Sequence, residues 1–130
     1  MNKQITEDYV SYEIAKLLKE KGFDELCNYE WWIPNNDKGY VLIANGQIKN
    51  SNLIDEAYTA PTHQMALKWL REVHNIFISI MCCTYPTLNK ITWIPDITTF
   101  ESVFPDSAVE CNSYEQAIET ALLYVLKNLI

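Results

Sequence analysis

Glycines, basic residues and long apolar runs are scarce in this chain. Only 3 of its 130 residues are glycine, and none of them forms a glycine-rich phosphate-binding loop. No stretch is apolar over the length that a membrane-spanning helix requires. Ten Lys and Arg against seventeen Asp and Glu give a formal net charge of −7. Because phosphate affinity depends on clustered basic side chains, this balance argues against nucleic-acid binding.

The chain also lacks the patterns of a secreted or metal-binding protein. Its first ten residues, MNKQITEDYV, contain no apolar run of a signal peptide, so we expect a cytoplasmic protein. In that reducing compartment the cysteines should be free thiols: Cys27, Cys82, Cys83 and Cys111. No C-x-x-C is present, and adjacent cysteines on a strand face opposite sides, which disfavours a zinc site from Cys82 or Cys83 with His74. We expect neither a metal nor a cofactor.

Apolar and aromatic side chains, in contrast, are plentiful. The composition is 48% hydrophobic and 12% aromatic, which argues against disorder. A chain of this length can bury most of its unfolded surface in one core. We therefore expect a single domain over residues 1–130.

The stretch Pro61–Met81 predicts a helix that runs directly into a strand. Thr62 can cap the helix start, and His74-Asn75 marks its end because asparagine accepts the left-handed conformation. The period then changes from 3.6 to 2 with almost no polar residues, which predicts an inner strand of a sheet. The apolar positions at helical spacing should face the core: Met65, Ala66, Trp69, Leu70 and Val73.

Two further helices have clear boundary signals. Ser11 begins the first, and Gly22 ends it because glycine adopts the left-handed conformation readily. Ser113 begins the last, with Gln116 three residues later in the pattern of a capping box.

The remaining apolar segments predict strands. Asn45-Gly46 is the strongest hairpin signal in the chain. Asn50–Ala60 has no clear period and is expected to be a loop or a ragged extension that leads to the central helix. Pro95 indicates an edge position or a bulge. Because hairpins dominate, we predict an α+β fold in the order α-β-β-β-α-β-β-α, with a mostly antiparallel sheet packed with three helices. Besides the strand that follows the central helix, the predicted strands are Tyr29–Ile33, Tyr40–Ala44, Gln47–Lys49 and Ile91–Ile97.

Three segments cover the predicted helices and about 40% of the chain: SYEIAKLLKEKGFDE at 11–25, APTHQMALKWLREVHNIFI at 60–78 and SYEQAIETALLYVLKNL at 113–129. These segments resemble a family of small uncharacterised proteins from gut bacterial genomes and their phages. The resemblance implies a phage or mobile-element setting. It implies no activity, and no functional residue is transferred from it.

Candidate catalytic residues are present without a motif that joins them. We expect His63 on the surface and His74 at the helix end, where the dipole favours a charged ring. A Cys–His pair would need a thiol, a base and an orienting group brought together by the fold. The groupings that could serve are Cys82 or Cys111 with His74, Asp55 with Glu56, and Asp96 with Glu101.

The sequence favours a small non-catalytic interaction protein over an enzyme. Consecutive strand residues point to opposite faces, so Trp31 and Trp32 cannot both lie under the helices. Both faces of the sheet are therefore apolar, which predicts a homodimer through the sheet or its edge, with one of these tryptophans near the contact. Two alternatives stay open: an enzyme with a Cys/His or carboxylate site in a loop cleft, and an acidic mimic of nucleic acid. Dispersed acids mixed with basic residues argue against the mimic.

Overall fold

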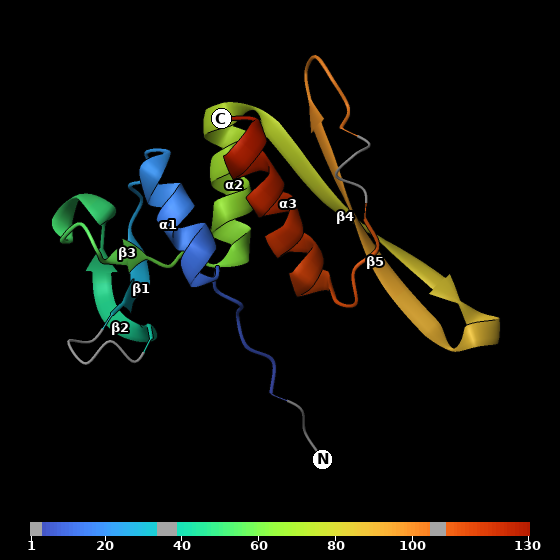
Figure 1. Ribbon diagram of the computed structural model, residues 1–130, viewed down its shortest axis with the longest axis horizontal. Coiled ribbons are helices and arrows are strands. Elements are labelled where there is room, and N and C mark those ends of the chain that lie inside the picture. The colour runs from blue at the N-terminus through green and yellow to red at the C-terminus, as the bar shows by residue number, and fades with distance from the viewer. Residues whose placement is uncertain (1–3, 34–38, 105–108) are drawn as a thin grey trace.

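The computed structural model describes residues 4–33, 39–104 and 109–130. Within these ranges the chain forms three α-helices and five strands in the predicted order, which confirms the α+β class. The strands are divided between two antiparallel sheets rather than joined in one. Figure 1 shows these sheets on opposite sides of the helices, so that the helices form the middle layer. None of the helices in the described ranges has the length and apolar character that crossing a membrane would require.

Each helix begins at its predicted capping residue. The hydroxyls of Ser11, Thr62 and Ser113 accept hydrogen bonds from backbone N–H groups three residues later, at 3.3, 3.1 and 3.0 Å. Gly22 follows the first helix with a φ of 93°, as predicted for its end. The helices are α1 (Tyr12–Glu20), α2 (His63–His74) and α3 (Tyr114–Asn128).

The first sheet has the order β2-β1-β3, with β1 (Cys27–Trp32) between β2 (Val41–Ile48) and β3 (Tyr58–Thr59). The predicted hairpin at Asn45-Gly46 is wrong, because both residues lie inside the continuous strand β2. Tyr29 pairs with Ala44 and Cys27 with Ile48, so four steps along β2 oppose two along β1. Gly46, at a φ of 56°, supplies the positive dihedral of this bulge instead of a turn.

The third strand comes from the segment that was expected to be a loop. A short 3-10 helix, η1 (Asn50–Asn52), precedes it, and β3 then pairs with Glu30 and Trp31. The buried side chain of Asn50 directs this path: its amide donates to the carbonyl of Phe23, and its oxygen accepts from the N–H of Thr59, both at 2.8 Å. The predicted strand at Gln47–Lys49 does not exist as a separate element.

The second sheet is a long two-stranded ribbon of β4 (Ile76–Tyr85) and β5 (Lys90–Thr99), joined by the 3-10 turn η2 (Pro86–Leu88). Asn75, at a φ of 55°, is the single residue between α2 and β4, which confirms the predicted helix-to-strand junction. The prediction of an inner strand is wrong, because β4 pairs with β5 alone in the described ranges. Pro95 lies in a strand at the sheet edge, as predicted.

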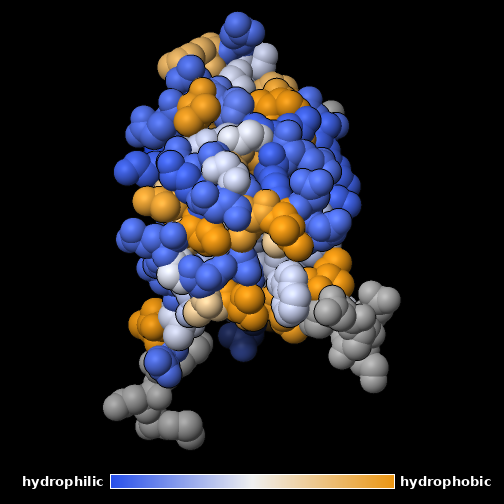
Figure 2. All heavy atoms as spheres, turned by 90° about the vertical axis from the view of Figure 1, so that its left-hand side faces the viewer, coloured by the Kyte–Doolittle hydropathy of each residue, from blue (hydrophilic) through white to orange (hydrophobic). Residues whose placement is uncertain are grey.

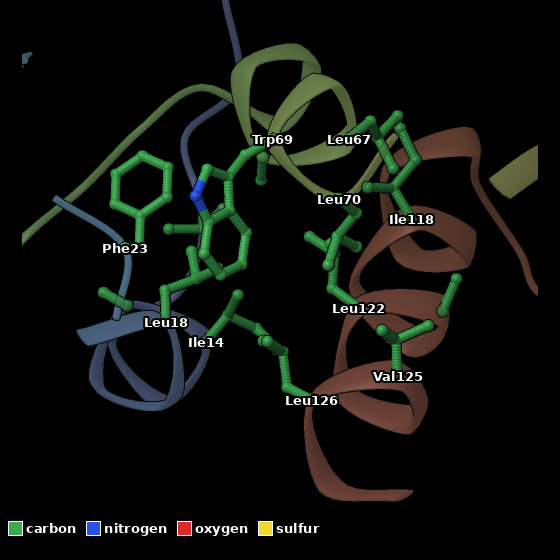
Figure 3. Packing of buried hydrophobic residues seen from close by; sticks show 14 of the residues in the cluster. Ile14, Leu18, Phe23, Leu67, Trp69, Leu70, Ile118, Leu122, Val125 and Leu126 are labelled. Atoms are coloured by element: carbon green, nitrogen blue, oxygen red, sulfur yellow. The ribbon is translucent and has the colours of Figure 1, made fainter. Parts of the chain in front are cut away.

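The core lies among the three helices (Figure 3). Ala66, Trp69 and Leu70 are buried as predicted, but Met65 and Val73 are 40% and 55% exposed. The buried face of α2 is shifted because helices cover it on two sides. Trp69 packs against Phe23 next to α1, with ring centroids 5.3 Å apart, and Figure 3 shows Leu67 beside Ile118 of α3. The fully buried core side chains include Ile14, Leu18, Phe23, Leu70, Ile97, Ile118, Leu122, Val125 and Leu126.

Candidate functional site

The clearest candidate site is the outer backbone edge of β4, which we call the free β4 edge: the edge of Ile76–Tyr85 that does not face β5. On its inner side β4 pairs with β5 over all ten residues in one unbroken register. On its outer side no strand of the described ranges pairs with it. Its N–H and C=O groups can therefore bond an added extended strand.

The composition of β4 offers no barrier to such pairing. Its sequence, IFISIMCCTY, contains no charged residue and no proline. Natural edge strands are commonly blunted by charges, prolines, bulges or short length, and β4 has none of these devices. Ile76 is buried, whereas every residue from Ser79 to Tyr85 is exposed or half-exposed. Figure 1 shows why: β4 starts beside the helices, and the rest of the ribbon extends beyond them.

Large apolar side chains accompany the exposed part of the ribbon. Met81 on β4 and Ile91 on β5 are 55% and 54% exposed, and Leu88 in the turn is 70% exposed. Ile78 and Ile80 on the opposite face of β4 pack partly against the core. One end of the ribbon therefore packs against the core, and the other end exposes apolar side chains to solvent.

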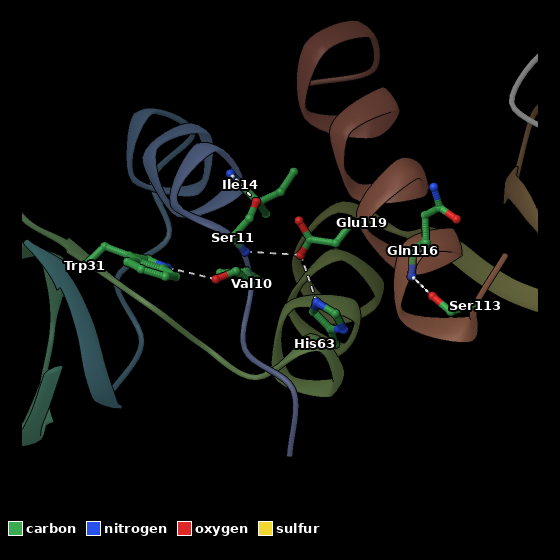
Figure 4. A network of polar contacts seen from close by, with 8 residues as sticks. All are labelled: Val10, Ser11, Ile14, Trp31, His63, Ser113, Gln116 and Glu119. Carbon is green, nitrogen blue, oxygen red and sulfur yellow. Dashed lines mark hydrogen bonds and ion pairs between the residues drawn. The ribbon is translucent and has the colours of Figure 1, made fainter. Parts of the chain in front are cut away.

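A second candidate is the contact between His63 and Glu119, where the prediction of a surface His63 is wrong. His63 is only 5% exposed, and its Nε2 lies 2.8 Å from Glu119 Oε2. The same carboxylate oxygen accepts the backbone N–H of Ser11 at 3.2 Å. These contacts join α2, α3 and the start of α1 (Figure 4). Burial raises the pKa of Glu119, but the hydrogen bonds from His63 and Ser11 lower it by more, so its pKa lies below the ordinary 4.5.

A recess of about 240 Å³ lies next to His63. Its rim includes the exposed carboxylates Glu7, Asp8 and Glu115, together with Gln64 and Tyr114. No cysteine or serine lines it. Of its two threonines, Thr62 is already used as the cap of α2, and Thr6 is an exposed residue of the segment before α1. A histidine held by a carboxylate resembles part of a catalytic triad, yet here no thiol or serine accompanies it. The contact is best explained as a structural link between helices.

The predicted catalytic groupings are not assembled. His74 packs its ring against Trp69, with centroids 4.6 Å apart, whereas Cys82 lies six strand residues beyond Ile76, roughly 20 Å along β4. The thiol of Cys111 is buried and points to the hydroxyl of Thr120 at 3.8 Å. Neither thiol shares a contact with His74.

The predicted carboxylate pairs are also ordinary surface groups. Asp55 and Glu56 are exposed in the segment before β3, and Asp96 and Glu101 are exposed on and just after β5. All four cysteines are free. In the described part of the chain, no group of three or more His, Cys, Asp or Glu side chains could hold a metal ion.

Trp31 and Trp32 lie on opposite faces of the first sheet, as strand parity requires. The indole of Trp31 donates to the carbonyl of Val10 at 2.8 Å, and its ring packs edge-on against Tyr12 and Tyr40. Trp32 is half-buried. From this end of the molecule, hydrophobic groups alternate with hydrophilic ones (Figure 2). The role of these tryptophans in an interaction surface stays a prediction.

Sequence reasoning missed both structural features of this section. The free β4 edge could not be predicted, because an apolar run such as IFISIM is compatible both with an inner strand and with an exposed edge strand. The His63–Glu119 contact was hidden because its partners are 56 residues apart. Comparison of the chain with protein-family models, with curated proteins and with solved structures found no match.

Proposed function

We propose that this chain is a non-catalytic interaction protein that binds an extended strand of a partner protein at the free β4 edge. The observation that carries the proposal is the ten-residue, uncharged strand β4, which within residues 4–33, 39–104 and 109–130 pairs with another strand on one side only. Addition of a strand to an exposed sheet edge is a recurring mode of protein recognition, in which backbone hydrogen bonds supply affinity.

The side chains of β4 supply the means of selecting a partner strand. Successive side chains of an added strand would point to opposite faces of the enlarged sheet, so each face would continue one face of the ribbon. Met81, Cys83 and Tyr85 line one face, and Ile80 and Cys82 line the other. A partner strand with apolar or small residues on both faces therefore fits this edge, and a strand rich in charges does not.

An enzymatic role receives no comparable support, because the candidate thiols lie away from His74 and no thiol or serine lines the recess beside the His63–Glu119 contact. The nucleic-acid mimic is also less well supported, since the free edge is apolar and the exposed acids named above come from separate segments.

A binding experiment tests the proposal directly. The probe is a fluorescent peptide with the sequence of Ile78–Tyr85, both cysteines replaced by serine and lysines added at its ends. We expect it to bind the full chain, and Ser79→Lys to weaken binding by about tenfold or more, because an edge lysine opposes strand addition. Ala44→Lys is the matched control, since Ala44 is an exposed residue on the edge strand β2.

Two outcomes would overturn the proposal. One is equal binding of a scrambled peptide of the same composition, which would reveal attraction of the lysines to the acidic chain alone. The other is equal weakening by Ser79→Lys and Ala44→Lys.

A further inference from the structure

Resting on the proposed function, we infer that the strand bound at the free β4 edge belongs to a second copy of this chain. The two β4 strands pair antiparallel about a two-fold axis at Cys82. The product is a continuous four-stranded sheet in the order β5-β4-β4-β5. Such an interface is self-complementary, as two-fold interfaces require, because each copy presents the same edge to the other.

The distribution of charge favours a second copy at this place. Two chains of net charge −7 repel each other wherever their carboxylates meet. The segment Ser79–Tyr85 carries no charge, so two copies approach there without a pair of opposed carboxylates. The charged residues Lys90 and Asp96 of the ribbon lie on β5, across the strand from the free edge. Glu110 also lies beside this segment, and its carboxylate accepts the hydroxyl of Tyr85 at 2.9 Å.

The exposed length of β4 sets the register. Ser79 is the first exposed residue of β4, and the strand stays exposed or half-exposed from there to Tyr85, whereas Ile76 is buried and Phe77 and Ile78 are half-buried. The midpoint of this part is Cys82. Pairing about Cys82 sets Ser79 opposite Tyr85 of the second copy, Ile80 opposite Thr84, and Met81 opposite Cys83. Each pair has the same parity, so both faces of the ribbon continue across the interface.

Apolar side chains enlarge this interface beyond the backbone bonds. Stable interfaces generally bury more than about 1,000 Å², and seven paired residues alone supply only part of that area. Met81 on β4 and Leu88 in the turn are more than half exposed, and their burial would add the hydrophobic contribution.

The native cysteines provide a test of position. Directly opposed residues of antiparallel strands have Cα atoms about 4.5–5.5 Å apart, within the range of a disulfide. Cys82 is exposed and would face Cys82 of the second copy, so mild oxidation at micromolar concentration should yield a cross-linked dimer. Cys82→Ser should abolish the cross-link. Cys83→Ser should retain it, because Cys83 is opposed by Met81 in this register.

Sedimentation under reducing conditions tests the association itself. We expect the unmodified chain and Cys82→Ser to sediment as dimers. Cys82→Glu should raise the dimer dissociation constant by about tenfold or more, because it sets two carboxylates opposite each other at the axis. Ile91→Glu is the control and should leave the dimer intact, because Ile91 is as exposed as Met81 but lies on β5. Circular dichroism establishes that each variant is folded, and Met81→Glu provides a second disruptive change beside the axis.

A chain that sediments as a monomer at all micromolar concentrations would overturn the inference. If the strand peptide still bound, the proposed function would stand with a different protein as partner. A dimer unaffected by Cys82→Glu and Met81→Glu would also overturn the inference. If Trp32→Ala dissociated that dimer, the contact would lie on the first sheet.

Discussion

The outer strands β2 and β4 sit at opposite ends of the molecule and differ in regularity rather than in charge. Neither contains a charged residue. In β2 the regular pairing with β1 runs from Val41 to Ala44 and is then broken by the bulge around Gly46. In β4 the pairing is unbroken over ten residues. A bulge twists and shortens an edge, so β2 is a poor template for another strand and β4 is a good one.

The largest expected effect concerns the core on which both sheets depend. Trp69→Ala should lower the free energy of unfolding by about 3–5 kcal/mol, because it removes an aromatic ring buried against Phe23 and His74. Lys68→Ala, at the neighbouring exposed position, should change it little. Denaturant titration measures both. Equal, small effects would show that α2 does not bury this face.

A smaller effect is expected at the polar contact that joins the two halves. Glu119 on α3 bonds Ser11, which caps α1, and α1 contacts the first sheet while α3 contacts the ribbon. Glu119→Gln should cost about 1–2 kcal/mol near neutral pH, since a charge-assisted hydrogen bond is replaced by a neutral one.

The pH dependence of this loss follows from the lowered pKa of Glu119. A carboxyl whose pKa is depressed by folding contributes stability above its unfolded pKa and loses that stability as the pH falls through its folded pKa. The difference in free energy of unfolding between the unmodified chain and Glu119→Gln should therefore be largest above the ordinary pKa of 4.5 and should vanish well below it. If this free-energy difference stayed constant in acid, the carboxylate of Glu119 would not be its source.

A loss of similar size is expected at the bulge that distinguishes β2 from β4. Gly46→Ala should cost about 1–2 kcal/mol, because Gly46 has a φ of 56° that other residues adopt with strain. No atom lies within 4 Å of the position of an added Cβ, so the cost is one of backbone conformation. Gly46→Asn should cost less, since asparagine tolerates this region. Thermal unfolding of the two variants compares them, and equal losses would point to a different cause.

Local signals predicted local structure well in this chain. The capping residues Ser11, Thr62 and Ser113 and the junction at Asn75 depend only on near neighbours, and the structure confirms each of them. Asn45-Gly46 failed as a hairpin because the same positive φ serves a turn or a bulge, and the pairing of β2 with β1 decides between them.

The candidate site could not be predicted because it depends on distant parts of the chain. Whether β4 is an inner or an outer strand is decided by which other strands reach it, and among the described residues only β5 does so. Likewise, the spacing of Met65 and Val73 fits a stripe, but the position of α1 and α3 shifts the buried face toward Leu67.

The long separation between Ser11 and Glu119 has a consequence for synthesis of the chain. Their contact spans 108 positions, so the core cannot close until α3 has left the ribosome. The ribbon needs only residues 76–99, and hairpins pair in microseconds whereas translation adds roughly 5–20 residues per second. The ribbon, with its free β4 edge, can therefore form and be exposed on the nascent chain before the core is complete. Neighbouring ribosomes on one messenger hold identical edges close together, so the dimer that we propose would be able to form during translation.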